Sequence, residues 1–506
     1  MAHQLENIGR VLVLGLGKSG KSVTNYCADL LGTRVSSLFV AAGARNDDSE
    51  AFLAQLADRG VEYAFGDTAL ERFAGDGTAF DICIASPGIP YWHELYELGS
   101  SLSRELVSEV EFAWRESAPE SVWVAITGTN GKTTTTSCCA HVLRECGFAA
   151  DAVGNIGDVC LDAVAAGKTQ VYVAEVSSYQ LYSTSRFAPD IAVMLNITPD
   201  HIHWHKTFEA YTDAKFKVFE NMRPGKAAFN PVAIFDAVNG VVRAKLDELQ
   251  ALSKEERGFD LVAMGTADGI HGDMRMCGGT PNAAFLDADD VLHIAYDGVD
   301  HSLIKAGKLQ IKGEHNASNA LAAATVAVVL GANDADIVRA LEAFPALEHR
   351  IEPCGEVDGV ECVNDSKATN VDATLKALRA FPDQRVIVLL GGDDKGTDLA
   401  ELVDSALDHV HAVVCFGAAG ARFEQAFDAV SDKIPPDFRL VRANHLEDAL
   451  DEALSIASAG DVVLLSPACA SFDEFTSFEQ RGRAFKQMVA ERARRAGRVA
   501  PEAQEG

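Results

Sequence analysis

Short runs of apolar residues, each followed by a polar or glycine-rich turn, recur along the whole chain. The first three are Val11–Leu14, Val35–Val40 and Asp81–Ala85. Near-continuous apolar runs separated by helical stretches are typical of parallel strands that are buried on both faces. The pattern therefore predicts an α/β fold.

The same alternation continues in two further blocks, one from about Val122 to Pro345 and one from about Ala346 onward. The strands predicted in them are Val122–Thr127, Val171–Glu175, Ile191–Asn196, Arg385–Leu390, Ala412–Phe416 and Asp461–Leu465. Glycine and acidic turns dominate residues 231–305, where only Val291–Ala295 is predicted as a strand. At about 150 residues per domain, 506 residues allow three or four domains.

A phosphate-binding turn is the most informative local feature. The strand from Val122 runs into a glycine-rich turn that ends in a lysine and two threonines, namely Gly128, Thr129, Asn130, Gly131, Lys132, Thr133 and Thr134. Backbone N–H groups and the start of the next helix surround phosphate oxygens, the lysine adds positive charge, and a hydroxyl can hold Mg²⁺. The strict consensus has glycine where Ile126 stands, so the match is to a shorter variant. The alternative is an ordinary glycine turn before a helix.

A second glycine turn, Gly15–Gly20, follows the first strand as in dinucleotide-binding folds. Binding of NAD would need an acidic residue after the next strand, yet Val40 leads into two alanines and Gly43. A nucleotide diphosphate fits the turn better. The strand Asp81–Ala85 should bring the Ser86-Pro87-Gly88 turn to the same end of the sheet, where it can meet a second phosphate.

Three side chains of the second block follow strands that should end at one edge of a sheet. Glu175 ends one strand, His201 follows another, and Lys132 lies in the phosphate turn, so they can converge on one crevice. Taken singly, a glutamate at a strand end such as Glu175 is usually solvated, and a histidine such as His201 is usually a polar surface group. Further on, Asn316 and Asn319 lie three residues apart on one face of a helix start and could reach one purine. Alternatively, Asn316 is the N-cap of that helix.

Composition narrows the choice of partners and location. The formal net charge of −30 argues against nucleic acid or an anionic membrane as a general partner, because both need basic surfaces. The 11 cysteines contain no C-x-x-C pair, which favours reduced thiols over a disulfide framework or a zinc site. The early apolar stretches are too short to span a bilayer. We therefore expect a cytoplasmic protein without membrane insertion.

Taken together, the motifs resemble those of the Mur ligases of peptidoglycan assembly over nearly the whole chain. The similar segments are Gly15–Gly20, Gly128–Thr135, Gly154–Gly157, Glu175–Leu181, Asp200–His201, Gly313–Asn316 with Asn319, His349–Arg350 and Asn364–Asn370. Within the family, Asn364–Asn370, Gly391–Lys395 and the segments Ser466–Phe475 and Phe478–Gly482 are similar to those of the members that add D-glutamate.

The resemblance implies three domains and an ATP-dependent ligase. The domains are an N-terminal Rossmann-like UDP-binding domain (1–108), a central P-loop ATPase domain with a parallel sheet (109–345) and a C-terminal Rossmann-like α/β domain (346–506). The implied reaction adds D-glutamate to UDP-N-acetylmuramoyl-L-alanine through an acyl phosphate, with ATP and two Mg²⁺ ions, in a monomer. The alternatives are another Mur ligase, or a ligase like folylpolyglutamate synthase, that adds a different amino acid.

The resemblance also assigns roles to single residues. Lys132, Glu175, His201 and Lys215 are the implied catalytic residues, and Thr133, Glu175, His201 and Lys215, if carbamylated, the metal ligands. The implied UDP-sugar residues are Gly15, Leu16, Gly17, Lys18, Ser19, Ser86, Pro87, Gly88 and Asn155. Those for ATP are Gly128–Thr134, Asn316, Asn319, Arg350 and Asp365, and those for D-glutamate are Lys367, Thr369, Lys395, Ser471 and Phe478.

Two observations bear on these assignments. From spacing alone, Lys215 would be an ordinary solvated helix lysine, and only the resemblance suggests its modification. After Asp200-His201 the family often has an acidic residue, whereas this chain has Ile202-His203-Trp204-His205. Two other classes of function fit less well. A nicotinamide oxidoreductase leaves the phosphate turn unused, and a silent nucleotide-binding scaffold would lack the implied catalytic set.

Overall fold

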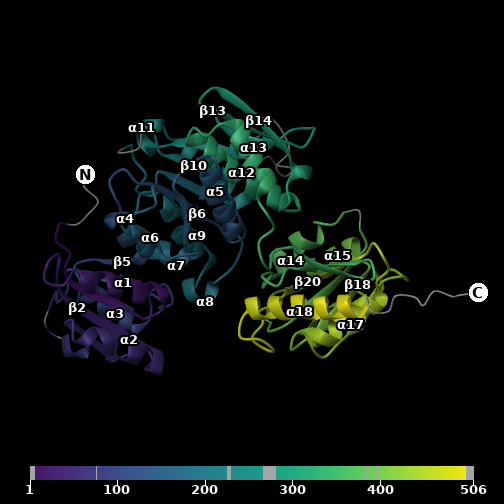
Figure 1. Ribbon diagram of the computed structural model, residues 1–506, viewed down its shortest axis with the longest axis horizontal. Coiled ribbons are helices and arrows are strands. Elements are labelled where there is room, and N and C mark those ends of the chain that lie inside the picture. The colour runs from purple at the N-terminus through teal and green to yellow at the C-terminus, as the bar shows by residue number, and fades with distance from the viewer. Residues whose placement is uncertain are drawn as a thin grey trace, which may run out of the picture. The chain divides into compact units, whose positions relative to one another are not determined.

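The computed structural model describes residues 6–73, 75, 77–224, 230–265, 281–382, 384–394 and 396–496. The chain forms two compact units, Met1–Lys308 with Ser318–Glu342, and Leu309–Ala317 with Ala343–Gly506. The division between them falls inside helix α12 (Glu314–Val329). The described residues form three sheets, each packed with helices, which confirms the three-domain α/β prediction (Figure 1). The domain boundaries given above stay a prediction.

The first sheet is entirely parallel, with strand order β3-β2-β1-β4-β5. Its strands are β1 (Gly9–Leu14), β2 (Val35–Ala42), β3 (Val61–Phe65), β4 (Ile82–Ala85) and β5 (Leu106–Ser108). Its helices are α1 (Lys18–Asp29), α2 (Asp47–Ala57), η1 (Glu71–Phe73) and α3 (Glu94–Ser101). Because β1 lies between β2 and β4, the glycine turn after β1 and the Ser86 turn after β4 are neighbours, as predicted.

The second sheet has nine strands in the order β14-β13-β12-β11-β10-β9-β6-β8-β7. They are β6 (Val122–Thr127), β7 (Ala150–Gly154), β8 (Val171–Glu175), β9 (Ile191–Met194), β10 (Val232–Asp236), β11 (Asp260–Met264), β12 (Ala283–Leu286), β13 (Val291–Tyr296) and β14 (Val299–Lys305). Only β12–β13 and β13–β14 pair antiparallel. The prediction of a single strand in residues 231–305 was therefore too sparse, since β10, β11, β12 and β14 also lie there.

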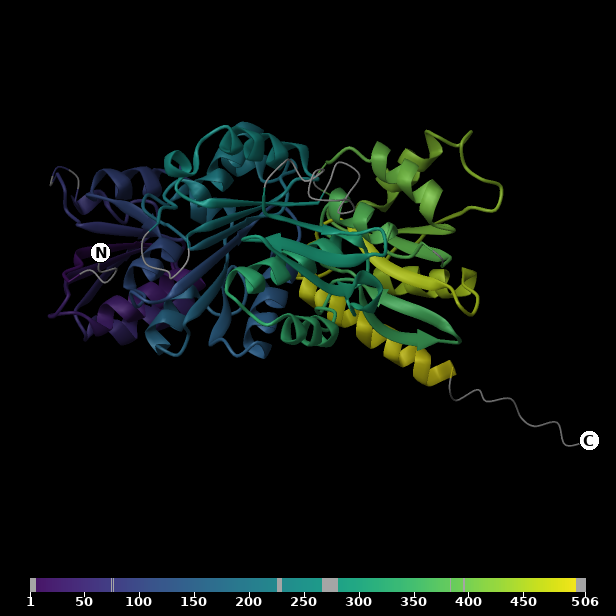
Figure 2. The ribbon, with the colours of Figure 1, turned by 90° about the horizontal axis from the view of Figure 1, so that it is seen from above.

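Helices lie on both sides of the parallel strands of this sheet (Figure 2). They are α4 (Glu109–Glu116), α5 (Lys132–Glu145), α6 (Cys160–Ala166), α7 (Ser178–Tyr182), α8 (Ile202–His205), α9 (Phe208–Phe216), η2 (Lys217–Phe219), α10 (Gly240–Gln250), α11 (Lys254–Arg257), η3 (Ala306–Lys308), α12 and α13 (Asp334–Ala343). Gly331 ends α12 in the left-handed conformation, with φ of 79°, as expected of a helix C-cap.

The third sheet makes up the core of the second unit, in the order β15-β16-β20-β17-β18-β19. Its strands are β15 (Glu352–Val357), β16 (Val360–Asn364), β17 (Val386–Gly391), β18 (Ala412–Phe416), β19 (Arg439–Arg442) and β20 (Val462–Ala468). Its helices are α14 (Val371–Leu378), α15 (Ala400–His409), α16 (Gly420–Asp428), α17 (Leu446–Ile456) and α18 (Phe478–Ala496). Every pairing except β15–β16 is parallel.

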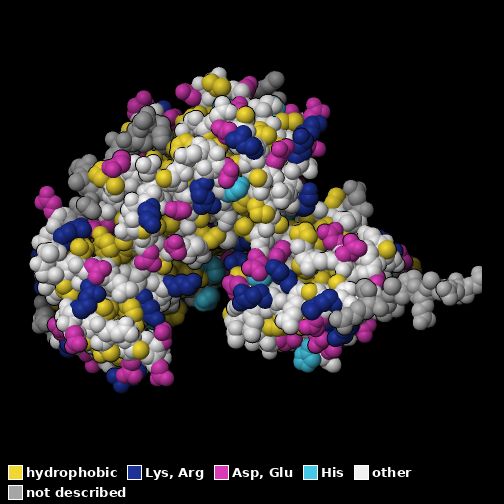
Figure 3. Space-filling view, in the orientation of Figure 1, with side chains coloured by type: hydrophobic (Ala, Val, Ile, Leu, Met, Phe, Trp, Pro, Cys, Tyr) yellow, Lys and Arg dark blue, Asp and Glu magenta, His cyan; other side chains and the backbone are white. Residues whose placement is uncertain are grey.

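The apolar runs that predicted the strands form the cores. Every residue of Val11–Leu14 and of Val386–Leu390 is fully buried, which is the burial expected of parallel strands covered on both faces. On the visible face in Figure 3, acidic and basic side chains are interspersed over the described part of the chain. Within the described residues, no helix is long and apolar enough to cross a membrane.

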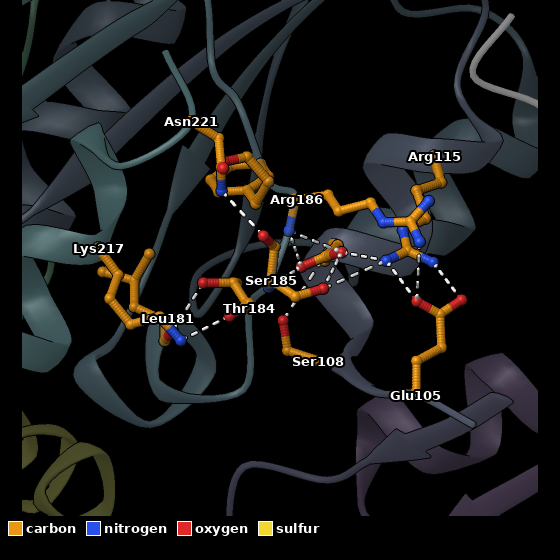
Figure 4. A network of polar contacts seen from close by, with 11 residues as sticks. Glu105, Ser108, Arg115, Leu181, Thr184, Ser185, Arg186, Lys217 and Asn221 are labelled. Carbon is orange, nitrogen blue, oxygen red and sulfur yellow. Dashed lines mark hydrogen bonds and ion pairs between the residues drawn. The ribbon is translucent and has the colours of Figure 1, made fainter. Parts of the chain in front are cut away.

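A buried polar network joins the first sheet to the second (Figure 4). Glu111, on α4, has a fully buried side chain that accepts hydrogen bonds from the backbone N–H groups of Ser185 at 2.5 Å and Arg186 at 3.1 Å. Arg115 donates to Glu111 and forms a bidentate pair with Glu105, at 2.7 and 3.0 Å. Because Glu105 precedes β5 and Ser185 precedes β9, the network fixes the junction between these two domains.

We expect Arg115→Ala to destabilise the first unit by about 3–5 kcal/mol, because it leaves the Glu111 charge buried without its cation. Thermal and denaturant unfolding of the full chain measure this change. Arg59→Ala is the control, since Arg59 pairs with Asp29 at the surface and its loss should cost less than about 1 kcal/mol. Equal stability of the two variants would contradict a structural role of the network.

Candidate active site

A cavity of about 860 Å³ opens at the carboxyl ends of the first sheet and reaches the second. It brings together all of the residues predicted for the UDP-sugar: Gly15, Leu16, Gly17, Lys18, Ser19, Ser86, Pro87, Gly88 and Asn155. Asn155 comes from the turn after β7, and the other residues come from the turns after β1 and β4. Their role in binding stays a prediction, but their convergence is a property of the fold.

The glycine turn offers unpartnered donors to the cavity. Gly15 is in the left-handed region with φ of 82°, and Gly17 begins α1 without a capping side chain. The first N–H groups of α1 are therefore available to an anion. The buried hydroxyl of Ser86 has no hydrogen-bond partner among the described residues. A bound phosphate oxygen would satisfy both kinds of group.

The phosphate turn after β6 is held open by the loop after β9. The backbone N–H of Thr129 donates to the carbonyl of Asn196 at 2.7 Å, and that of Asn130 donates to the Asn196 side chain at 2.8 Å. Gly128 and Gly131 have φ of 153° and 86°, which a side chain would strain. The helix α5 then begins at Lys132, so its N-terminus faces the turn.

Two lysines meet at the carbonyl oxygen of Gly128. Lys132 donates to it at 2.9 Å and Lys215, from α9, donates at 2.7 Å. Lys215 is only 2% exposed. Burial, and then the nearby charge of Lys132, hold the pKa of Lys215 well below its usual value, although Asp200 and Glu175 oppose the shift. A lysine in this setting is favoured as the neutral, nucleophilic amine.

Glu175 lies between the cavity and the phosphate turn. Its carboxylate is 1% exposed, and its Oε1 accepts a hydrogen bond at 2.8 Å from the side chain of Asn155, a cavity residue. Its Oε2 has no partner among the described residues. The contact between Asn155 and Glu175 therefore connects the cavity to the turn that carries Lys132.

His201 occupies a strained position after β9. Its φ of 54° lies in the left-handed region, and its Nε2 is 3.5 Å from the Asp200 carboxylate. The residues that depart from the family pattern form the short helix α8, in which His205 is buried and pairs with the Ser178 hydroxyl at 2.9 Å. Burial, followed by the charges of His201 and Lys215, lowers the pKa of His205 to about 4.

Among the residues expected to hold metal, Glu175 and Thr133 offer oxygen donors and His201 offers a nitrogen. Mg²⁺ prefers oxygen ligands, and the Oε2 of Glu175 is a buried oxygen with no other described partner. No group of three or more His, Cys, Asp or Glu side chains in the described ranges has a metal-binding arrangement. The predicted set does not need one, because it contains only Glu175 and His201 of these residue types, together with Thr133 and a carbamate on Lys215.

In the second unit, most of the residues predicted for D-glutamate belong to loops around one buried arginine. The ammonium of Lys367 lies 4.1 Å from the ring centroid of Phe478, and Ser471 is 2% exposed. The backbone N–H of Thr369 donates to the Lys367 carbonyl at 2.8 Å. Lys395, predicted for the same site, lies outside the described residues.

Arg481 is the buried arginine, and the sequence analysis gave it no role. It is fully buried and donates to the carbonyls of Ser366 at 2.9 Å, Cys469 at 3.0 Å and Ala470 at 3.0 Å. It therefore fixes the loop that carries Lys367 against the loop that carries Ser471. The motif that contains it was noted, but three long-range carbonyl contacts are not visible in sequence. The same is true of Gln180, Asp67 and His93, which line the cavity without having been predicted.

The residues predicted for adenine and ribose divide between the two units. In the first, the Oδ1 of Asn319 accepts from the Thr135 hydroxyl at 3.0 Å, beside the phosphate turn. In the second, Asn316 donates to the Lys312 carbonyl at 2.7 Å from within α12, so the N-cap alternative was wrong. Burial raises the pKa of Asp365 to about 7, although the Ser466 hydroxyl donates to it at 2.7 Å and Arg350 also opposes the shift. The convergence of these residues on one nucleotide stays a prediction.

Comparison with known proteins supports the motifs. A model of the Mur ligase middle domain matches residues 126–327, and one of the Mur ligase glutamate ligase domain matches residues 349–469. The UDP-N-acetylmuramoylalanine–D-glutamate ligase of Salinibacter ruber is 36% identical over 488 residues, which is 95% of this chain and 97% of that protein. The ligase of the same name from Koribacter versatilis is 36% identical over 489 residues, 96% of this chain and 98% of that one. The chain belongs to the Mur ligase family. Members of this family depend on ATP and Mg²⁺ in general.

Solved structures agree with this Mur ligase at the level of the fold. The UDP-N-acetylmuramate–alanine ligase MurC of Thermotoga maritima has a TM-score of 0.53 and 15% identity, covering 96% of this chain and 99% of that one. A pseudomurein peptide ligase type C from Methanothermus fervidus has a TM-score of 0.52 and 16% identity, covering 95% and 99%. The three-sheet architecture is therefore shared beyond the closely similar sequences.

The glycine turn gives a prediction that separates folding from binding. A Cβ on Gly20 would lie 2.0 Å from the carbonyl oxygen of Gly15, so Gly20→Ala should destabilise the turn by about 1–3 kcal/mol. A Cβ on Gly17 meets nothing within 4 Å. Gly17→Ala should keep the melting temperature within a few degrees of wild type yet weaken UDP binding, because the new methyl group stands on the cavity wall. Calorimetry measures both quantities, and a Gly20→Ala protein as stable as wild type would contradict the packing argument.

Proposed function

We propose that this Mur ligase joins D-glutamate to UDP-N-acetylmuramoyl-L-alanine with consumption of ATP, in the synthesis of peptidoglycan precursors. The observation that carries the proposal is the contact between the cavity residue Asn155 and Glu175, since it connects the cavity proposed for the UDP-sugar to the turn proposed for ATP. The names of the relatives from Salinibacter ruber and Koribacter versatilis, both D-glutamate ligases at 36% identity, support the choice of amino acid.

The proposed chemistry follows from the inertness of a carboxylate. The L-alanyl carboxylate is negatively charged and lacks a good leaving group, so an amine does not attack it. Transfer of the γ-phosphoryl group of ATP to one carboxylate oxygen forms an acyl phosphate and releases ADP. The D-glutamate amine then attacks the acyl carbon, the tetrahedral intermediate expels phosphate, and the amide forms.

The residues of the phosphate turn would carry the first step. Phosphoryl transfer depends mostly on positioning and charge neutralisation, and the N–H groups at the start of α5 with the ammonium of Lys132 would supply both. In the structure this ammonium is held by the carbonyls of Gly128 and Thr129, at 2.9 and 2.8 Å.

Two Mg²⁺ ions would be held by this chain, one by Thr133 and one by Glu175, His201 and a carbamate on Lys215. When bound, they supply charge neutralisation between the phosphoryl group and the approaching carboxylate. Asn155 would orient Glu175 by the hydrogen bond to its Oε1, leaving Oε2 for a metal. Carbamylation replaces an ammonium, which repels a cation, by oxygen ligands.

The second unit would bind D-glutamate and part of the nucleotide. Lys367 with Lys395 offers positive charge to the two carboxylates, and Thr369 and Ser471 offer hydroxyl groups. Phe478 would hold the Lys367 side chain through the contact at 4.1 Å. We infer that Asn316, Asn319, Arg350 and Asp365 surround the adenine and ribose. A cytoplasmic location is part of the same proposal, because ATP is a substrate, and we also propose that the protein is a monomer.

A phosphate-release assay with UDP-N-acetylmuramoyl-L-alanine and ATP tests the function. Separate reactions contain D-glutamate, L-glutamate, meso-diaminopimelate or D-alanyl-D-alanine. We expect turnover with D-glutamate only. Turnover with a diamino acid or a dipeptide would favour another Mur ligase, and use of a folate in place of the UDP-sugar would favour a folylpolyglutamate-synthase-like enzyme. Without phosphate release in any reaction, the proposal fails.

Lys215→Ala should be inactive, and short carboxylates such as acetate or propionate should restore part of the activity by replacing the carbamate. The physical reason is the burial that keeps the amine neutral and so able to react with CO₂. Rescue is measured as turnover against carboxylate concentration. Lys217→Ala serves as the control, since Lys217 is held by the carbonyls of Tyr182 and Thr184, and its variant should not respond to carboxylates. Equal responses of the two variants would contradict the assignment.

A further inference from the structure

The cavity contains a group that could read the nucleobase, and this inference rests on the proposed function. If the glycine turn and Ser86 bind the diphosphate, none of the residues predicted for the UDP-sugar is assigned to the base. The strand β2 ends at Ala42, and the next two residues, Gly43 and Ala44, line the cavity but carry no polar side chain. Recognition of the base by a side chain must therefore come from other residues in the cavity wall.

Four polar side chains of the first sheet line the cavity beyond the predicted set, namely Asn46, Ser49, Asp67 and His93. The side chain of Asn46 is already engaged in a hydrogen bond, because its oxygen accepts from the backbone N–H of Ser49 at 2.9 Å and so caps α2. Ser49 is buried in the first turn of the same helix. Asp67 and His93 remain, one after β3 and one after β4.

The hydrogen bond by which His93 caps helix α3 determines which ring nitrogen carries the proton. Its Nδ1 accepts a hydrogen bond at 3.2 Å from the backbone N–H of Leu95, at the start of α3. A ring nitrogen that accepts carries no proton, so the neutral ring is protonated on Nε2. That Nε2 is 3.8 Å from the Oδ1 of Asp67, which is too long for a hydrogen bond. The Nε2–H donor of His93 and the carboxylate acceptor of Asp67 therefore lie side by side without a hydrogen bond between them.

We propose that Asp67 and His93 recognise the edge of uracil. The Asp67 carboxylate accepts the N3–H of the base, and the Nε2–H of His93 donates to the neighbouring O4 carbonyl oxygen. Cytosine reverses both contacts, because its N3 has a lone pair that faces the carboxylate and its amino group faces the His93 donor. The pair therefore determines specificity for uridine over cytidine nucleotides.

Binding of UDP and of CDP to the full-length protein, measured by titration calorimetry, tests the proposal without turnover. Wild type should prefer UDP by about 10- to 100-fold, the range for a hydrogen bond to a charged group. Asp67→Asn should lower that preference at least about tenfold, because an amide can donate to the N3 of cytosine. His93→Asn keeps an oxygen that caps α3 but removes the Nε2 donor, and should also lower the preference.

Asp58→Asn is the matched control, since Asp58 is an exposed carboxylate of the same domain that does not line the cavity. Its UDP preference should equal that of wild type. In turnover assays, Asp67→Ala should raise the KM for the UDP-sugar about tenfold and leave the KM for ATP and D-glutamate unchanged.

A wild-type protein that binds UDP and CDP equally, or an Asp67→Asn protein with an unchanged preference, would overturn the inference while ligase activity persisted. Binding of UDP without any ligase activity would instead overturn the proposed function and leave base recognition standing. A protein that binds neither nucleotide would overturn both.

Discussion

The carbonyl oxygen of Gly128 is the point on which the site depends, because two lysines share it. Two ammonium groups at 2.7 and 2.9 Å from one oxygen repel each other strongly in a buried setting. The carboxylates of Glu175 and Asp200 offset part of this repulsion, and loss of the proton from Lys215 removes the rest. The carbonyl of one glycine thus couples Lys132, which we propose neutralises phosphate, to the buried amine of Lys215, whose pKa differs from that of an ordinary lysine.

Short contacts connect the site around Gly128 to the cavity of the first sheet. Asn155 belongs to the cavity wall and holds Glu175. The network around Arg115 and Glu111 keeps the two domains in register, so the cavity and the phosphate turn form parts of one compact unit. In the second unit, Arg481 similarly holds two loops together, because it donates hydrogen bonds to three backbone carbonyls. Buried arginines therefore fix backbone segments in both units.

Sequence predicted the parallel strands well because burial on both faces requires unbroken apolar runs, as at Val11–Leu14. It missed β15, where Pro353 and Gly355 interrupt an edge strand, and β14, where polar residues alternate on an exposed edge. The turns that line the cavity were predictable from glycine spacing. The hydrogen bond from Asn155 to Glu175 was not, since it depends on β7 lying beside β8. Asp67 and His93 were missed because single polar residues after strands carry no motif.

The central claim is that an inert carboxylate becomes reactive by accepting a phosphoryl group beside Lys132. Oxygen-isotope transfer tests it most directly. UDP-N-acetylmuramoyl-L-alanine labelled with ¹⁸O in the alanyl carboxylate is converted with ATP and D-glutamate, and the released phosphate is analysed by mass spectrometry. The account predicts one ¹⁸O atom in each phosphate, carried from the acyl group when the amine displaces it. Phosphate without label, formed together with the amide product, would contradict it.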